Sequence, residues 1–259
     1  MKFLHCASVA VLAVAGGLSA PSCSADSFTV HEALEDTKLY FTAPARWDGR
    51  DWLEFGVALA AVGVAHEFDG RVREHFAVGS HAQFGAKDKN STRDALPTAA
   101  LVAGTFVYAS LLGDPDGYRE TWSYLEAGAF SAVSAEVLKF ASGRVRPNFT
   151  ASPDHWRQKG NSFPSLHVTA AFAIGTTFAE SGNDEYRWIR RVIGYGIAAG
   201  TAYGRLHDNV HWLSDTVAGA ALGIATARFV LDRQGMNHHA SIQFQPSQDG
   251  WMIAYTKAF

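Results

Sequence analysis

The chain has almost no cysteine. Its 259 residues include only Cys6 and Cys23, and both lie within the first 25 residues. That segment has the pattern of a secretory signal peptide: Lys2 gives a positive start, an apolar stretch follows, and small residues precede Asp26. Cleavage before Asp26 would leave a protein without thiols, which excludes disulfides, thiolate metal sites and a cysteine nucleophile. An uncleaved membrane anchor is the alternative, although the apolar stretch is short for a membrane span.

The sequence also has few charged residues and no excess of basic ones. There are 22 Lys and Arg against 25 Asp and Glu, which gives a net charge of −3. Nucleic-acid-binding domains usually carry a basic excess, so no nucleic-acid partner is expected. The content of 47% hydrophobic and 18% charged residues is that of a folded chain, not a disordered one.

Apolar segments dominate the chain after a mixed, polar N-terminal arm at residues 26–50. Their length and their content of Ala, Gly and Val predict helices, at residues 52–65, 97–112, 122–142, 165–180, 188–204 and 212–231. A charged linker over residues 66–96 separates the first two. We therefore expect an all-α fold, a bundle of about six core helices over residues 51–235.

Long uninterrupted apolar runs are missing from these segments. The runs reach about 14–17 residues, below the roughly 20 that a membrane span needs, and charges such as Glu126 and Arg190 fall within or near them. Trp52 and Trp188, at segment starts, are in contrast typical of membrane interfaces. We favour an exported, periplasmic helical domain associated with a membrane, and integral membrane insertion is left open.

The tail, residues 236–259, has a different pattern. Apolar and polar residues alternate before and after a turn at residues 247–250, and this alternation predicts a β-hairpin. The aromatic end at Phe259 also resembles the last strand of an outer-membrane barrel. Because one hairpin cannot close a barrel, we favour a hairpin that covers the helical core.

Three short blocks in the second half of the chain carry candidate catalytic residues. Residues 139–147 place cations at the end of a predicted helix, residues 163–167 stand at a helix start, and residues 204–215 contain a histidine and an aspartate one helical turn apart. The candidates are Lys139, Arg146, Ser165, Leu166, His167, Arg205, His211 and Asp215.

Each block alone has an ordinary structural explanation, such as solvated charges or a capped helix start, but together they form a phosphate site. Three cations and a helix N-terminus can hold a phosphoryl group. A neutral His211 can attack phosphorus while Asp215 fixes its tautomer, and His167 can protonate the leaving oxygen. This chemistry needs no metal, and we expect no cofactor.

The three blocks together resemble the PAP2 superfamily, which includes bacterial acid phosphatases, lipid phosphate phosphatases and vanadium haloperoxidases. Its signature is Lys-x6-Arg-Pro, Pro-Ser-Gly-His and Ser-Arg-x5-His-x3-Asp, and the resemblance covers residues 122–231. It implies a helical bundle in which His211 forms a phosphohistidine and His167 is the general acid. It also implies that phosphate is bound by Lys139, Arg146, Ser165 and Arg205.

Two positions depart from that signature. Leu166 stands where the family usually has glycine, and Gly204 where it usually has serine. The Leu166 amide can still donate a hydrogen bond, but its side chain narrows the mouth of the site. With Gly204 one hydroxyl donor is absent. Both departures leave open whether water or an alcohol accepts the phosphoryl group, and thus whether the protein is a phosphatase or a lipid phosphotransferase.

Three other interpretations compete with a phosphatase. A metal hydrolase could use His207, Asp208, His211 and Asp215 as ligands, but that interpretation leaves Lys139, Arg146 and residues 165–167 unexplained. A haloperoxidase would bind vanadate at His211; a phosphatase would only be inhibited by vanadate. A non-catalytic phospholipid-binding protein would need the cations but not the histidines. The substrate is expected to be a phosphorylated small molecule or lipid, and the apolar helix ends and Trp212 favour a lipid-linked phosphate.

Overall fold

The computed structural model describes residues 30–78, 84–85, 88, 90–182, 184–236, 240–247 and 250–257. The expected signal peptide at residues 1–25 lies outside the described residues and stays a prediction. The chain divides into two compact units, residues 1–41 and 42–259. In the first unit, α2 (Val30–Phe41) has Glu32 in its first turn and Lys38 in its last, the order that the helix dipole favours.

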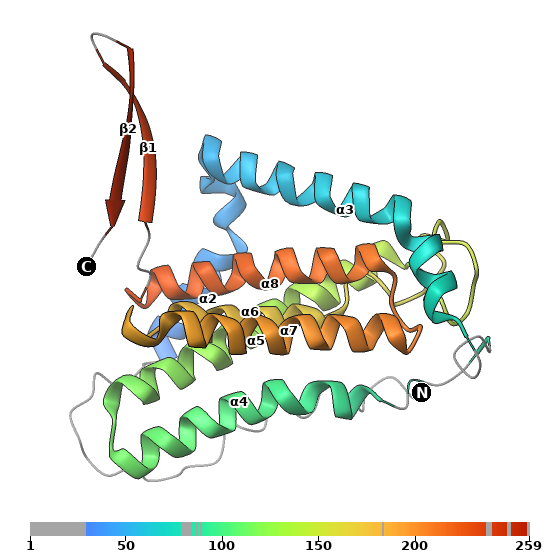
Figure 1. The fold of residues 1–259 in the computed structure, drawn as a ribbon, viewed down its shortest axis with the longest axis horizontal. Helices are drawn as coiled ribbons and strands as arrows, with labels where there is room; N and C mark the ends of the chain where they lie inside the picture. Colours follow the sequence, from blue (N-terminus) through green and yellow to red (C-terminus); the bar gives the residue numbers. More distant parts are fainter. Residues whose placement is uncertain are drawn as a thin grey trace. The chain divides into compact units, whose positions relative to one another are not determined.

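Helices make up most of the described part of the second unit (Figure 1). They are α3 (Gly49–Phe76), α4 (Ser91–Leu112), α5 (Pro115–Ser142), α6 (Leu166–Glu180), α7 (Arg187–His207) and α8 (Leu213–Arg233). Short 3-10 helices, η1 (Ala43–Arg46) and η3 (Asp184–Tyr186), precede α3 and α7. Strands β1 (Ala240–Ser247) and β2 (Gly250–Lys257) pair antiparallel. The predicted helical fold class, with about six core helices, is confirmed.

Local sequence signals set the ends of these helices. Asp48 caps α3: its Oδ1 accepts hydrogen bonds from the backbone N–H groups of Arg50 and Asp51 at 2.7 and 2.9 Å. At the other end of the bundle, Gly143 stops α5 in the left-handed conformation, with φ 55°, which glycine adopts at little cost. This stop brings Lys139 to the last turn of α5 and starts the loop that holds Arg146.

Helix α6 packs against α5, α7 and α8, and small residues let it approach the last two closely. A Cβ atom on Gly194 of α7 would lie 2.3 Å from the carbonyl oxygen of Gly175 in α6, and one on Gly223 of α8 would lie 2.4 Å from that of Thr169. Backbone therefore meets backbone at both contacts, which explains why these segments are rich in Ala and Gly. The close packing fixes the helix ends at which the candidate residues lie.

The helices are longer than the apolar pattern indicated, mainly at the expected linker over residues 66–96. Helix α3 continues to Phe76 and α4 already begins at Ser91. The charged end of α3 is helical because its side chains have tertiary partners: Asp69 is fully buried, and Arg73 Nε donates to the carbonyl oxygen of Pro147 at 3.2 Å. The N-terminal arm also contains helix, in α2 and η1.

Many large apolar side chains point outward from the second unit. Leu53 and Val57 on α3, Leu111 on α4 and Phe140 on α5 are all more than half exposed, and Phe140 reaches 93%. Helix α4 (Ser91–Leu112) is long and apolar enough to cross a membrane, with a mean hydropathy of 1.7 and only 11% of that window buried. Soluble proteins rarely expose large apolar patches, so these exposed side chains are consistent with contact between the protein and a membrane.

Candidate active site

The predicted nucleophile and its orienting carboxylate meet at the start of α8. His211 Nδ1 lies 3.3 Å from Asp215 Oδ2, and the same oxygen accepts a hydrogen bond from the backbone N–H of Trp212 at 3.0 Å. Because a carboxylate can only accept, Nδ1 carries the proton and Nε2 keeps its lone pair. The helix start and the side-chain pair together hold the imidazole in the tautomer that a nucleophile needs.

His211 is also held neutral. It is 3% exposed, and burial lowers its pKa well below 6.5. The positive charges of the three predicted cations lower the pKa further, in the order Arg146, Lys139, Arg205. These electrostatic effects also mean that the three cations gather around one imidazole. A neutral imidazole beside three positive charges can attack an anionic phosphoryl group that those charges have attracted.

Two of the cations are anchored by one residue. Lys139 Nζ donates to the backbone carbonyl oxygen of Asn161 at 2.8 Å, and Arg146 Nε donates to the side-chain oxygen of Asn161 at 2.9 Å. Burial, followed by the charge of Arg146, lowers the pKa of Lys139 to about 8. Lys139 is therefore still charged at neutral pH, but by a narrower margin than an exposed lysine.

The third cation, Arg205, already has carboxylate partners. Its guanidinium is fully buried and hydrogen-bonded to Asp88 and, at 3.0 Å, to Asp94 Oδ2. Asp88 Oδ2 also lies 3.9 Å from Arg146 Nη1. Burial alone would raise the pKa of Asp88, but its hydrogen bond to Arg205 and the two arginine charges lower it. A carboxylate thus lies between two arginines that were predicted to bind phosphate.

The serine at the start of α6 has a free hydroxyl. Ser165 is buried, and its backbone N–H donates to the carbonyl oxygen of Asp215 at 3.1 Å. Among the described residues, its Oγ and the Nε of Arg205 have no hydrogen-bond partner. Buried donors are rarely left unpaired in folded proteins. An anion at this helix N-terminus could accept a hydrogen bond from Ser165 Oγ, and the half-buried Leu166 follows as the first residue of α6.

His167 lies in the first turn of α6, within reach of a residue that sequence analysis missed. Its Nε2 is 2.9 Å from Ser91 Oγ at the start of α4. Burial and the charge of Arg205 lower the pKa of His167 to about 4, against the opposite effect of Asp88 and Asp94. The free protein therefore holds His167 neutral at pH 7. A dianionic phosphate nearby would favour its protonated form.

The departure at Gly204 has a structural explanation. A Cβ atom at this position would lie 3.2 Å from Asp94 Oδ1, so a serine would crowd the carboxylate that binds Arg205. Glycine lets Asp94 approach Arg205 where the family usually has a hydroxyl. No local pattern around residues 88–94 indicates these acidic partners, because Asp88 reaches the site from the segment before α4 and Asp94 from the first turn of α4.

His207 and Asp208, the candidate ligands of a metal hydrolase, do not have the surroundings of a metal site. His207 is about half exposed at the end of α7 and lies 3.3 Å from Asp208 Oδ1, while Arg93 Nη2 lies 3.5 Å from Asp208 Oδ2. A cation next to this carboxylate disfavours a metal ion there. In the part of the chain that the structure describes, no three His, Cys, Asp or Glu side chains form a group that could hold a metal.

Comparisons with known proteins agree with the residue pattern. Residues 120–238 match the family model described as the PAP2 superfamily. Over 86 residues the chain is 40% identical to the lipid A 1-phosphatase of Porphyromonas gingivalis, a match that covers 33% of this chain and 17% of that protein. The chain thus matches only a small part of that relative's length.

A solved structure is also similar. It is the crystal structure of the first transmembrane PAP2 type phosphatidylglycerolphosphate phosphatase from Bacillus subtilis, with 19% identity and a TM-score of 0.38 over 78% of this chain and 96% of that one. The region that matches the family model contains every predicted site residue. Over residues 120–238, somewhat less than half of its length, the chain is thus similar to the PAP2 superfamily.

Proposed function

We propose that the chain is a metal-independent phosphatase that hydrolyses phosphomonoesters or pyrophosphates through a phosphohistidine intermediate. The observation that carries this proposal is the buried, neutral His211, whose Nδ1 is held by Asp215 and whose surroundings are positive. A protein that only binds phosphate needs the positive charges. It does not need an imidazole kept neutral and in one tautomer.

The reaction has two steps. In the first, Nε2 of His211 attacks phosphorus and the bond from phosphorus to the leaving oxygen breaks, while His167 gives that oxygen a proton. Lys139, Arg146 and Arg205 stabilise the charge on the phosphoryl oxygens. In the second step, water attacks the phosphohistidine, His167 takes the proton from the water, and phosphate leaves with His211 restored.

The anion must displace Asp88 from the two arginines in this mechanism. The carboxylate of Asp88 lies between Arg146 and Arg205 and carries the same sign of charge as the substrate. Binding therefore exchanges one anion for another at the same cations. The exchange lowers affinity for weak anions and favours a dianionic phosphate, which makes more charge-assisted hydrogen bonds than a carboxylate does.

A lipid-linked phosphate is the substrate class that we propose. The matched relative is named for a lipid substrate, and Phe140, one residue after Lys139, is almost fully exposed. A groove of about 610 Å³ between α4 and α7 is lined in part by Pro97, Gly196 and Gly200, and it reaches Gly204, next to Arg205. An apolar chain fits these surfaces while the phosphate faces the cations.

We also propose that the protein works outside the cytoplasm, in contact with a membrane. The signal pattern of residues 1–25 supports export, and the exposed apolar faces of α3, α4 and α5 support contact with lipid. Fractionation of cells that express the full chain tests this. We expect the protein in the membrane fraction, released by detergent and not by high salt.

The test of function compares p-nitrophenyl phosphate with phosphatidate in mixed micelles, in excess EDTA, with His211→Ala beside the native chain. Turnover that survives EDTA, is inhibited by vanadate and disappears in the variant supports the proposal. Transfer of phosphate to an added alcohol in preference to water would indicate a phosphotransferase. Phosphate binding without turnover of either compound would indicate a phospholipid-binding protein instead.

A further inference from the structure

Arg144, which the mechanism does not use, makes both aromatic contacts and several hydrogen bonds with its guanidinium. It follows Gly143, the C-cap residue of α5, and its side chain is fully buried. Its guanidinium carbon lies 4.3 Å from the ring centre of Trp156 and 5.4 Å from that of Trp212. Its Nε and Nη2 donate to the carbonyl oxygen of Pro153 at 3.1 and 3.0 Å. These contacts fix the plane of the guanidinium.

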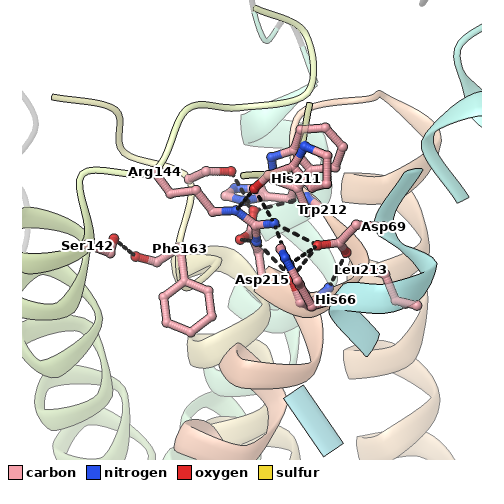
Figure 2. A network of polar contacts seen from close by, with 12 residues as sticks. His66, Asp69, Ser142, Arg144, Phe163, His211, Trp212, Leu213 and Asp215 are labelled. Atoms are coloured by element: carbon pink, nitrogen blue, oxygen red, sulfur yellow. Dashed lines mark hydrogen bonds and ion pairs between the residues drawn. The ribbon is translucent and has the colours of Figure 1, made fainter. Parts of the chain in front are cut away.

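The rest of this guanidinium joins two buried carboxylates. Nη1 donates to Asp215 Oδ1 and Nη2 to Asp69 Oδ2, each at 2.6 Å, and both carboxylates are fully buried. Figure 2 shows Arg144, Asp69, Asp215 and His211 within one network of polar contacts. Because Arg144 binds Oδ1 of Asp215, the other oxygen remains for His211, the Trp212 amide and Ser162 Oγ at 2.5 Å.

Asp69 also holds the helix start on which His211 depends. Its Oδ1 accepts a hydrogen bond from the backbone N–H of Ser214 at 2.8 Å, and its Oδ2 accepts one from Ser214 Oγ at 2.6 Å. Ser214 lies in the first turn of α8, where backbone N–H groups have no partner within the helix. A residue of α3 thus caps α8 through tertiary contact, close to His211.

The charges of this cluster matter for the reaction. One guanidinium faces two carboxylates, so Arg144, Asp69 and Asp215 together carry one net negative charge. The neighbouring His66, whose Nδ1 lies 3.0 Å from Asp69 Oδ2, adds no charge as long as its imidazole is neutral. That excess lies next to the imidazole, which becomes positive when His211 is phosphorylated. If Asp69 were neutral, Arg144 would offset the whole charge of Asp215, and the imidazole would lose much of its stabilisation in the transition state.

We propose that Arg144 and Asp69 are positioning residues of the reaction, acting on His211 through Asp215. Arg144 orients the carboxylate, and Asp69 keeps the charge of Arg144 from cancelling that of Asp215. Asp69 lies on α3, outside the residues 120–238 that match the family model. The inference rests on the proposed function, and it extends the functional unit to a helix that the family match does not cover.

The first test is a comparison of Asp69→Asn with the native chain. Asparagine has the same shape and still offers an oxygen to the Ser214 amide, so the variant keeps the cap of α8. We expect kcat to fall about 10- to 100-fold, the usual effect of losing a partner of a functional ligand. The inhibition constant of inorganic phosphate, which reports ground-state binding, should change by less than threefold. Arg228→Met, at an exposed arginine, is the surface control.

Arg144→Lys and Arg144→Met form the second pair. Both variants lose the planar guanidinium that binds two carboxylates at once. Lysine keeps the positive charge, so kcat of Arg144→Lys should be at least tenfold higher than kcat of Arg144→Met. The proposal is overturned if Asp69→Asn retains kcat within threefold. It is also overturned if kcat falls only in proportion to the folded fraction, measured by circular dichroism, or to the loss of phosphate binding.

A readout that needs no turnover separates this inference from the proposed function. Nitrogen NMR of histidine-labelled protein reports which ring nitrogen of His211 carries the proton. We expect the Nδ1–H form alone in the native chain and a mixture of tautomers in Asp69→Asn, with a lower pKa of the ring. An unchanged tautomer in Asp69→Asn and Arg144→Lys overturns the positioning role, even if the native chain proves to have no phosphatase activity.

Discussion

The pKa of Lys139 sets where the activity should decline at alkaline pH. Lys139 is 6% exposed, and burial together with the charge of Arg146 lowers its pKa to about 8. Above that pH the amine loses its proton and no longer attracts the phosphoryl group. The second ionisation of a phosphate ester lies near pH 6, so the substrate itself does not titrate in this range. We expect kcat/KM to fall about tenfold for each pH unit above 8.

In the Lys139→Arg variant, the alkaline decline of kcat/KM should begin at a higher pH, while the cation that the phosphoryl group needs is kept. A guanidinium stays charged at all accessible pH values, so the alkaline limb of kcat/KM should shift upward by at least one pH unit. The maximum should be lower, because the planar fork cannot reproduce the single contact from Nζ to the Asn161 carbonyl oxygen at 2.8 Å. The parameter to compare is kcat/KM, since it reports the free enzyme while kcat reports the complex.

The assay is a pH series from 6 to 10 with p-nitrophenyl phosphate in buffers of constant ionic strength. The reasoning fails if Lys139→Arg shows its alkaline limb at the same pH as the native chain, because another group would then control it. It fails equally if the native chain keeps a constant kcat/KM up to pH 10. Circular dichroism at each pH guards against loss of folded protein.

Two further predictions concern the acidic and histidine residues around the cations. Asp88→Asn should lower the inhibition constant of inorganic phosphate about tenfold, because a charge-assisted contact worth roughly 1.5–3 kcal/mol no longer competes with the phosphate. The exposed control Asp116→Asn should leave this constant unchanged. An unchanged constant in Asp88→Asn would contradict the placement of Asp88 between the two arginines. For His167 the folded pKa of about 4 lies below its ordinary 6.5, so the unfolded chain binds more protons between these values. The free energy of unfolding should thus decrease by about 2–3 kcal/mol as pH falls from 6.5 to 4, and thermal melts of His167→Asn should show a smaller decrease if this is right.

The predicted site residues could be found from sequence because the chemistry uses short blocks at helix ends. A lysine at a helix end, a serine at a helix start and a histidine one turn from an aspartate each leave a local signal. The structure brings Lys139, Arg146 and Arg205 around His211. The assigned catalytic roles go beyond this geometry and are what the experiments address.

The site residues that the sequence does not reveal bind partners that are far away along the chain. Asp69 and Asp88 are single acidic residues in charged surroundings, and their partners Arg144 and Arg205 lie 75 and 117 positions away. Hydrophobic periodicity reports burial and not pairing. For the same reason the sequence predicts a linker where α3 ends, because a buried aspartate cannot be told from a surface charge before its arginine partner is known.

The most direct test of the account is to trap the phosphoryl group on His211. Purified protein in excess EDTA is mixed with substrate labelled at the phosphorus and quenched in alkali within milliseconds, a condition under which phosphohistidine survives. The account predicts label on the peptide that contains His211, formed before phosphate is released and absent in His211→Ala. Rapid turnover with no label on the protein, or turnover by His211→Ala close to that of the native chain, would contradict the central claim.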